Sequence, residues 1–246
     1  MVNEETYRQL VEMKLHGMAQ SFREYLDQPG GKDGLSFVER FGMMVDREWS
    51  QRQERRLKYR LTTSKLREPA CLEDVNYKHP RSLDRSVMQR LGTCRWVKEH
   101  ENVLVTGSTG LGKTWLACAL AQKACRDGYT ALYARVPRLL HDLFLARGTG
   151  TYPKMMDQLA KPDVLLLDDF GLAPLSDLER RDFLELVEER QGRRSTIVTS
   201  QLLTKHWHEV IGEPTIADAV LDRLLSSAHR IDLTGESMRP KNRKDK

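Results

Sequence analysis

The sequence predicts an α/β protein in which a parallel sheet is flanked by helices and follows a small N-terminal all-helical domain. Two patterns carry this prediction. From residue 102 onward, short apolar runs alternate with helical patterns, whereas residues 3–67 show apolar side chains at helical spacing. Strands that alternate with helices favour a parallel sheet covered on both faces. At roughly 150 residues per domain, the 246 residues allow one to two compact units.

The N-terminal stretch predicts two amphipathic helices. A 4,4,3,4,4 spacing lines one face of a helix over residues 3–28, formed by Tyr7, Val11, Leu15, Met18, Phe22 and Leu26. The Pro29-Gly30-Gly31 segment is expected to end that helix. Ser36 and Glu39 form a capping-box pattern, after which Phe37, Phe41, Met44 and Trp49 continue as a second helix. Pro69 breaks the pattern, so we place the module boundary near residues 68–75.

Five short apolar runs predict the strands of the sheet. They are NVLVTG (102–107), TALYARV (130–136), DVLLLDD (163–169), STIVTS (195–200) and HRIDL (229–233). The last residues, GESMRPKNRKDK, form a polar basic tail that buries too little apolar surface to fold by itself.

Charge, hydropathy and cysteine spacing limit the partners and the compartment that are expected for the protein. The 40 Lys and Arg residues exceed the 35 Asp and Glu residues by five, which permits polyanionic partners without requiring them. No apolar run approaches the roughly 20 residues that cross a bilayer, and the polar start lacks a secretory h-region, so we expect a cytoplasmic protein. The spacing of the four cysteines matches neither a metal site nor a small disulfide framework, so we expect reduced thiols. These cysteines are Cys71, Cys94, Cys118 and Cys125.

A phosphate-binding motif follows the first predicted strand. Residues 107–114 fit GxxxxGK(S/T) and stand between a strand and a helix, as a P-loop requires. Backbone amides and the helix N-terminus would cradle phosphate oxygens, Lys113 would reach the β and γ phosphates, and the Thr114 hydroxyl would ligate Mg²⁺. The alternative is a glycine-rich turn without a ligand. The predicted nucleotide-binding residues are Gly107, Ser108, Thr109, Gly110, Leu111, Gly112, Lys113 and Thr114.

The run VLLLDD supplies the carboxylates that such a loop needs. Asp168 ends an apolar strand and is predicted to hold the hydrated Mg²⁺. Asp169 is expected on the opposite face of an extended strand, where it would polarise the attacking water; a plain strand-end carboxylate is the alternative. Residues 168–171 also match the DxxG of GTPases, and residues 169–171 match the kinase DFG. Without an NKxD segment, an HRD loop or a kinase Gly-rich hairpin, neither interpretation fits its context.

Two polar residues farther along complete the candidate catalytic set. Gln201 follows the strand STIVTS, from which its amide would orient water or sense the γ-phosphate. Arg223 falls on a predicted helix and would serve as an arginine finger toward ATP held by a neighbouring subunit; a solvated or Asp-paired helix arginine is the alternative.

Several motifs together resemble the IstB-like transposition helper ATPases of insertion sequences, which are similar to the replicative-helicase loader within the AAA+ superfamily. The motifs are GSTGLGKT, LLLDDFG, STIVTSQL, WHEVIGEPTIADAVLDRL and GESMR, together with the REW, RRLKYRL and ACLEDV segments upstream. The resemblance implies a P-loop AAA+ ATPase fold after the helical domain. It divides the chain into an N-terminal DNA-binding and assembly domain (1–70), an ATPase domain (71–235) and a basic tail (236–246).

The resemblance also implies an activity and partners. The expected protein uses ATP and Mg²⁺, forms an ATP-dependent homo-oligomer on double-stranded DNA without sequence specificity, and assists a separate transposase. By position, Gln201 stands where the superfamily often has Asn as first sensor, Arg223 matches the finger, and Arg239 falls near the second sensor. Asp169 stands where Glu is usual, and its shorter reach predicts slow hydrolysis. Few residues follow Arg239, so the helical lid is expected to be reduced or absent.

The DNA surface is predicted from charge. Between Arg47 and Arg67 stand eight basic and two acidic residues, which predicts salt-sensitive phosphate contacts; a charged solvated helix is the alternative. The basic residues chosen from this stretch are Arg52, Arg55, Arg56, Lys58 and Arg60, with Lys241, Arg243, Lys244 and Lys246 of the tail as auxiliaries. Trp49, Trp96 and Trp207 are expected to pack in the core.

Three other functions stay open at this point. A helicase loader would share the fold and act on a replicative helicase and single-stranded DNA. A P-loop small-molecule kinase would transfer phosphate to an acceptor, although the paired Asp168 and Asp169 favour water as the acceptor. A nucleotide-gated scaffold would bind nucleotide with negligible turnover.

Overall fold

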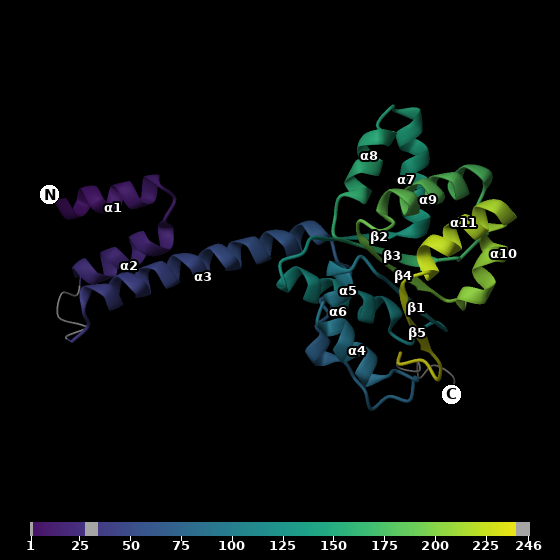
Figure 1. The fold of residues 1–246 in the computed structure, drawn as a ribbon, viewed down its shortest axis with the longest axis horizontal. Helices are drawn as coiled ribbons and strands as arrows, with labels where there is room; N and C mark the ends of the chain where they lie inside the picture. Colours follow the sequence, from purple (N-terminus) through teal and green to yellow (C-terminus); the bar gives the residue numbers. More distant parts are fainter. Residues whose placement is uncertain (1, 28–33, 240–246) are drawn as a thin grey trace, which may run out of the picture. The chain divides into compact units, whose positions relative to one another are not determined.

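The computed structural model describes residues 2–27 and 34–239. The chain forms two compact units, Met1–Tyr59 and Arg60–Lys246, hereafter the helical unit and the sheet unit (Figure 1). The division falls inside one long helix, upstream of the boundary placed near residues 68–75, because the helical pattern continues across it. The Pro29-Gly30-Gly31 segment and the basic side chains beyond residue 239 lie outside the described residues.

The helical unit contains α1 (Val2–Glu12), α2 (His16–Asp27) and the first part of α3 (Phe37–Ser64). The prediction of one helix over residues 3–28 is wrong, because Lys14 adopts a left-handed backbone (φ 60°) that ends α1. The Ser36–Glu39 capping box is confirmed: the Ser36 amide donates to Glu39 Oε2 at 2.7 Å.

A buried carboxylate explains why α2 begins where it does. Glu48 on α3 accepts hydrogen bonds from the amides of Gly17 (2.7 Å) and Met18 (3.4 Å), which lie in the first turn of α2 and lack intrahelical partners. Gly17 permits this approach, since a Cβ there would lie 2.7 Å from the Glu48 Cα. The apolar spacing continues across the break, so the sequence pattern alone does not reveal it.

The sheet unit carries five parallel strands in the order β2-β3-β4-β1-β5 (Figure 1). All five predicted strands are confirmed: β1 (Asn102–Gly107), β2 (Ala131–Arg135), β3 (Val164–Phe170), β4 (Ser195–Ser200) and β5 (Ala228–Leu233). The remaining elements are η1 (Leu72–Asp74), α4 (Arg85–Gly92), α5 (Arg95–Lys98), α6 (Lys113–Arg126), α7 (Val136–Gly148), α8 (Tyr152–Ala160), α9 (Asp177–Arg190), η2 (Thr204–His206), α10 (Trp207–Ile211) and α11 (Pro214–Leu225).

Helices cover both faces of the sheet (Figure 1). Leu104, Leu167 and Val198 point to one face, where they pack with apolar side chains of α7, α8, α9 and α11. Side chains alternate along a strand, so Val103 and Ile197 point to the other face, against which α6 packs. With both faces buried, the strands are almost continuously apolar, and the carboxyl ends of β1, β3 and β4 meet at one edge.

After β5 the described chain continues to residue 239 without a further helix. Within the described residues, no helix combines the length and apolar character needed to span a membrane.

Candidate nucleotide-binding site

The P-loop (residues 107–114) connects β1 to α6 and presents the start of that helix. Gly112 precedes α6 with a positive φ of 82°, and no side chain caps the first-turn amides. Gly107 also needs its freedom (φ 138°), since a Cβ there would collide with the carbonyl oxygen of Leu233 on β5. Uncapped amides at a helix N-terminus are suited to bind an anion, which fits a phosphate group.

Lys113 points back over the P-loop. Its side chain is 8% exposed, and Nζ donates to the Ser108 carbonyl at 2.9 Å. Burial lowers the pKa of Lys113, while the nearby Asp169 and Asp168 carboxylates act in the opposite direction. A buried ammonium whose only described hydrogen bond is to a backbone carbonyl gains strongly from an anion at this position, so the residue fits the phosphate-contacting role predicted for it.

Asp168 is fully buried at the carboxyl end of β3. Its Oδ1 accepts from the Thr114 hydroxyl at 2.7 Å and the Thr199 hydroxyl at 2.6 Å, and its Oδ2 accepts from the Tyr133 hydroxyl at 2.8 Å. The two predicted metal residues therefore meet directly. A hydroxyl beside a carboxylate suits Mg²⁺, which is commonly held by one or two protein oxygens together with substrate phosphates.

Asp169 lies on the cleft side, and the expectation of an extended strand at this residue is wrong. Its φ is +62°, and the β3–β4 register shifts between Leu167 and Phe170. This conformation turns the carboxylate toward Arg135 at the end of β2, whose Nε donates to Oδ2 at 2.7 Å. A non-glycine residue in this region costs about 1–3 kcal/mol, and such outliers concentrate at functional sites.

Gln201 and Arg239 are both brought to the P-loop. As predicted, Gln201 follows the strand between β1 and β3, where its Oε1 accepts from the Thr109 hydroxyl at 2.8 Å. The segment that carries Arg239 is held by the Met238 amide, which donates to the Gly110 carbonyl at 2.9 Å.

Together these residues line a cleft of about 550 Å³, hereafter the P-loop cleft. Its lining comprises Arg67, Glu68, Thr109, Gly110, Gly112, Lys113, Thr114, Trp115, Arg135, Asp169, Leu172, Gln201, Met238 and Arg239. From the sequence, Arg67 is expected only as part of the basic stretch, and neither Arg135 nor Tyr133 is predicted to lie at the site. An arginine or tyrosine on a strand belongs to no recognisable sequence motif, so the sequence offers little indication that these residues line the cleft or contact Asp168.

Arg81 supports the P-loop and was also missed. Its side chain is 2% exposed, and Nη1 donates to the Leu111 carbonyl at 2.8 Å. The same nitrogen lies 3.2 Å from the Met238 sulfur, and Nη2 donates to the Asn76 carbonyl at 3.3 Å. Arg81 thus joins the loop before α4, the P-loop and the C-terminal segment.

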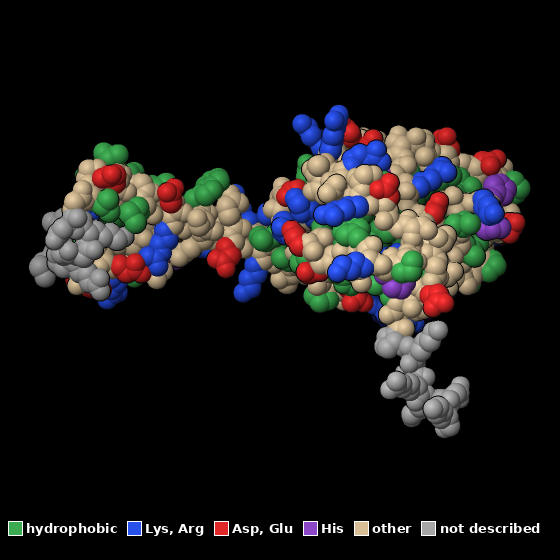
Figure 2. All heavy atoms as spheres, turned by 90° about the horizontal axis from the view of Figure 1, so that it is seen from below, with side chains coloured by type: hydrophobic (Ala, Val, Ile, Leu, Met, Phe, Trp, Pro, Cys, Tyr) green, Lys and Arg blue, Asp and Glu red, His purple; other side chains and the backbone are tan. Residues whose placement is uncertain are grey.

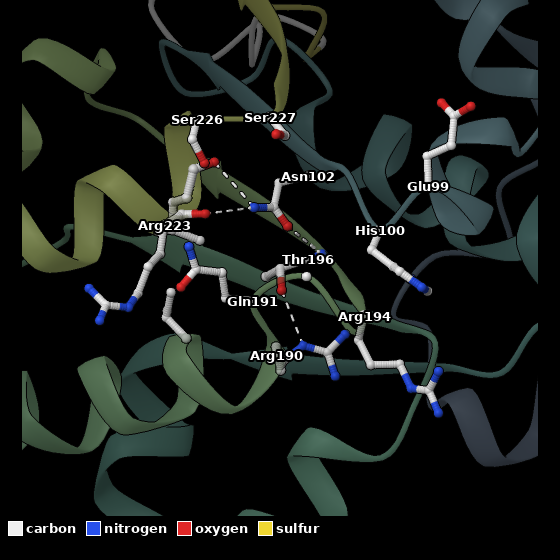
Figure 3. A pocket seen from close by; sticks show the side chains of 13 residues that line it. Glu99, His100, Asn102, Arg190, Gln191, Arg194, Thr196, Arg223, Ser226 and Ser227 are labelled. Atoms are coloured by element: carbon white, nitrogen blue, oxygen red, sulfur yellow. Dashed lines mark hydrogen bonds between the residues drawn. The ribbon is translucent and has the colours of Figure 1, made fainter.

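Arg223 lies beside Asn102 at the start of β1, at the edge of the sheet opposite the P-loop; Figure 3 shows the surroundings of Arg223. Asn102, the first residue of β1, donates from Nδ2 to the Arg223 carbonyl at 3.2 Å, whereas the P-loop follows the last residue of β1. The Arg223 guanidinium turns away from Asn102 and donates to Glu188 Oε1 at 2.7 Å. A strand of this length spans roughly 17–20 Å, so Arg223 is too far from its own P-loop to touch the same nucleotide.

The basic residues chosen for DNA differ in their surroundings. Arg52 Nε donates to Glu48 at 2.6 Å, Arg55 lies 3.8 Å from the same carboxylate, and Arg60 Nε donates to the Cys125 carbonyl at 2.8 Å. Arg55, Arg56 and Lys58 are all exposed. On the face of the helical unit seen in Figure 2, basic side chains are mixed with acidic and hydrophobic ones.

One tryptophan differs from its prediction. Trp96 and Trp207 are buried as predicted, but Trp49 is 62% exposed. It follows Glu48 directly on α3, and because Glu48 points inward toward α2, the helical rotation turns Trp49 away from that face.

Comparison with known proteins gives a consistent result. Residues 8–246 match the family model of the IstB-like ATP binding proteins. A protein of Sinorhizobium fredii (strain NBRC 101917 / NGR234) that is named as an insertion sequence ATP-binding protein is 49% identical over 244 residues, covering 99% of both chains.

Solved structures agree on the fold. The crystal structure of DnaI matches with a TM-score of 0.57 and 24% identity over 68% of this chain and 92% of that one. The DnaC helicase loader matches with a TM-score of 0.55 and 21% identity over 67% and 97%. The chain carries a P-loop on a five-stranded parallel sheet and matches the family model over nearly its whole length. It therefore belongs to the family of IstB-like ATP-binding proteins of insertion sequences.

Proposed function

We propose that this protein is a Mg²⁺-dependent AAA+ ATPase that assembles on double-stranded DNA without sequence specificity and assists a transposase in transposition. The observation that carries the proposal is the convergence of Lys113, Thr114, Asp168 and Asp169 at one edge of the sheet. A P-loop lysine, a metal-side hydroxyl and carboxylate and a second acid constitute the equipment for hydrolysing a nucleoside triphosphate.

The residues around the P-loop cleft fit ATP with Mg²⁺. The amides at the start of α6 and Lys113 would hold the phosphates, and Thr114 with Asp168 would hold the metal ion. When bound, Mg²⁺ neutralises charge that develops on the phosphates. Gln201 is held by Thr109 of the P-loop, a position from which its amide would sense the terminal phosphate.

Asp169 and Arg223 are the proposed hydrolytic residues of two different subunits. Asp169 is 20% exposed on the cleft side, where it would accept a proton from water, and Arg135 orients its carboxylate. Arg223, at the far edge of the sheet, would stabilise the phosphate charge in a neighbouring subunit. Hydrolysis would then depend on assembly and would disassemble or remodel the oligomer.

DNA binding is proposed for the exposed basic residues of α3 among those chosen from the sequence, which are Arg55, Arg56 and Lys58. Such contacts to the phosphate backbone carry no sequence information and weaken steeply with salt. The transposase role rests on the family, because relatives such as the Sinorhizobium fredii protein are named after insertion sequences.

One experiment tests the proposal as a whole: DNA binding and particle size measured with ATP, ADP and no nucleotide across a salt series. We expect larger particles and tighter DNA binding with ATP than with ADP. An R56A/K58A variant should show a shallower salt dependence, by roughly one unit of slope per lost contact, whereas K154A, with an exposed lysine on α8, should match the parent. Equal DNA binding in all three nucleotide states would contradict the proposal.

A helicase loader is the second candidate, favoured by the similarity of the fold to the DnaC helicase loader. Its target would be a replicative helicase and single-stranded DNA. Pull-down of the full chain against a transposase and a replicative helicase separates the two candidates, because each predicts retention by one partner and not by the other.

A further inference from the structure

Arg67 belongs to a segment that is fastened to the P-loop helix. It stands three residues after the end of α3 and five before η1. The backbone amides of Arg67 and Glu68 hydrogen-bond to the Cys118 sulfur on α6, and Ser64 and Ala70 on either side are fully buried. Burial raises the pKa of Cys118 to about 11, so the sulfur is a neutral thiol. The position of Arg67 beside the cleft is therefore fixed by packing within the sheet unit.

The Arg67 side chain lines the P-loop cleft with Lys113 and Thr114. Its Nη1 is 3.9 Å from Asp168 Oδ2, its Nε is 3.9 Å from Glu68 Oε1, and the guanidinium donates a hydrogen bond to the Tyr133 hydroxyl oxygen. Both carboxylate distances exceed hydrogen-bonding range, and the side chain is 53% exposed. A guanidinium has five N–H donors, so these contacts leave donors for a further anion.

The position of Arg67 along the cleft indicates which part of a bound nucleotide it would contact. Asp168 lies near the carboxyl end of β3, and Tyr133, in the middle of β2, donates to it. Asp168 also belongs to the predicted metal pair Thr114–Asp168, so Arg67 lies on the metal side of the cleft. The metal of a P-loop enzyme bridges the β and γ phosphates, so a cation here faces the terminal phosphate rather than the base. A planar guanidinium binds two phosphate oxygens at once, which a lysine does not.

We propose that Arg67 is a phosphate-binding residue that acts within its own subunit, contacts the terminal phosphate and thereby distinguishes ATP from ADP. The inference rests on the proposed nucleotide-binding function of the same cleft. Arg67 stands three residues after the end of α3, the helix that carries the candidate DNA contacts. When a terminal phosphate binds Arg67, the nucleotide state is therefore coupled to the C-terminal end of α3.

Calorimetry on the full chain tests the assignment, with Mg²⁺ and either a non-hydrolysable ATP analogue or ADP as the titrant. For R67A we expect affinity for the ATP analogue to fall roughly 10- to 100-fold, the range for a lost charged hydrogen bond, with ADP affinity changed much less. R67K should lie between, because it keeps the charge and loses the paired donors. R193A removes an arginine that is 74% exposed ahead of β4 and does not line the P-loop cleft, so it serves as the matched control. K113A should lose both nucleotides.

Hydrogen exchange over residues 61–70 supplies a readout independent of activity. The ATP analogue should slow exchange there in the parent protein and in R193A, and should leave exchange in R67A unchanged. If R67A and R67K keep the parental ratio of ATP to ADP affinity, the assignment of Arg67 is wrong although the cleft binds nucleotide. If the parent protein binds neither nucleotide, the proposed function itself fails. A melting curve for each variant identifies any loss of affinity that is caused by unfolding. If R67A is unfolded, the ratio of ATP to ADP affinity in R67K tests the assignment instead.

Discussion

The Thr114 hydroxyl donates a 2.7 Å hydrogen bond to Asp168, joining the helix after the P-loop to the end of β3. Thr114→Ser keeps a hydroxyl that can hold Mg²⁺, whereas Thr114→Val keeps the shape and removes it. We expect T114V to bind ATP equally with Mg²⁺ and with a chelator, and T114S to retain stronger binding with Mg²⁺. Nucleotide titrations under the two conditions measure this. Equal stimulation by Mg²⁺ in T114V and the parent would exclude Thr114 as a ligand.

Asp169 is held by Arg135 in a left-handed conformation, as expected for a positioned general base. Asp169→Asn preserves size and hydrogen bonding but accepts a proton poorly. We expect retained ATP binding, turnover slowed by roughly 10²- to 10⁴-fold and longer-lived DNA complexes. Steady-state phosphate release and DNA dissociation rates measure the two effects. A variant that hydrolyses ATP at the parental rate would remove Asp169 from the mechanism.

Arg223 and Lys113 lie at opposite edges of the sheet, so their proposed roles belong to different active sites. We expect Arg223→Ala and Lys113→Ala each to lose hydrolysis when assayed alone. Mixed together, they should recover part of it, because an intact cleft of the R223A subunit meets an intact arginine of the K113A subunit. Phosphate release across mixing ratios provides the measurement. No recovery at any ratio would argue against a shared site.

Glu48 makes the stability of the helical unit depend on pH. Burial acts to raise its pKa, but the hydrogen bonds from Arg52, Gly17 and Met18 together hold it below the ordinary value of 4.5. The folded-state pKa is therefore depressed, so the contribution of Glu48 is fully present above about pH 4.5 and is lost as the pH falls through the lowered pKa.

Hydrogen exchange of the α2 amides in the full chain from pH 7 to pH 3, corrected for intrinsic rates, measures the Glu48 contribution. The Glu48→Gln variant should be destabilised by roughly 1–3 kcal/mol at pH 7 and should lose less stability on acidification than the parent. Glu24→Gln removes a half-exposed partner of Arg47 and is the control, expected to change stability by less than about 1 kcal/mol. Identical acid sensitivity in E48Q and the parent would show that Glu48 does not act as the capping carboxylate.

The sequence predicted motifs that depend on local order and missed residues that depend on packing. The P-loop, the Asp168 strand end and all five strands follow from short-range pattern, because buried parallel strands are apolar throughout and a phosphate loop needs its glycines and lysine at fixed spacing. The start of α2 after the break depends on the carboxylate of Glu48, which is 31 residues away from Gly17. The spacing of apolar residues along the chain contains no information about such a distant contact.

By itself, the sequence determined the fold class, the family and the residues proposed to bind phosphate and metal, since these are encoded by neighbours along the chain. The tertiary structure decided which side chains share the cleft. It placed Arg67 beside Asp168, turned Asp169 toward Arg135 and put Arg223 at the far edge of the sheet. The crossover connections of the parallel sheet bring the carboxyl ends of strands that are distant in sequence to one edge. The number of residues between two side chains therefore does not predict how close they lie in the fold.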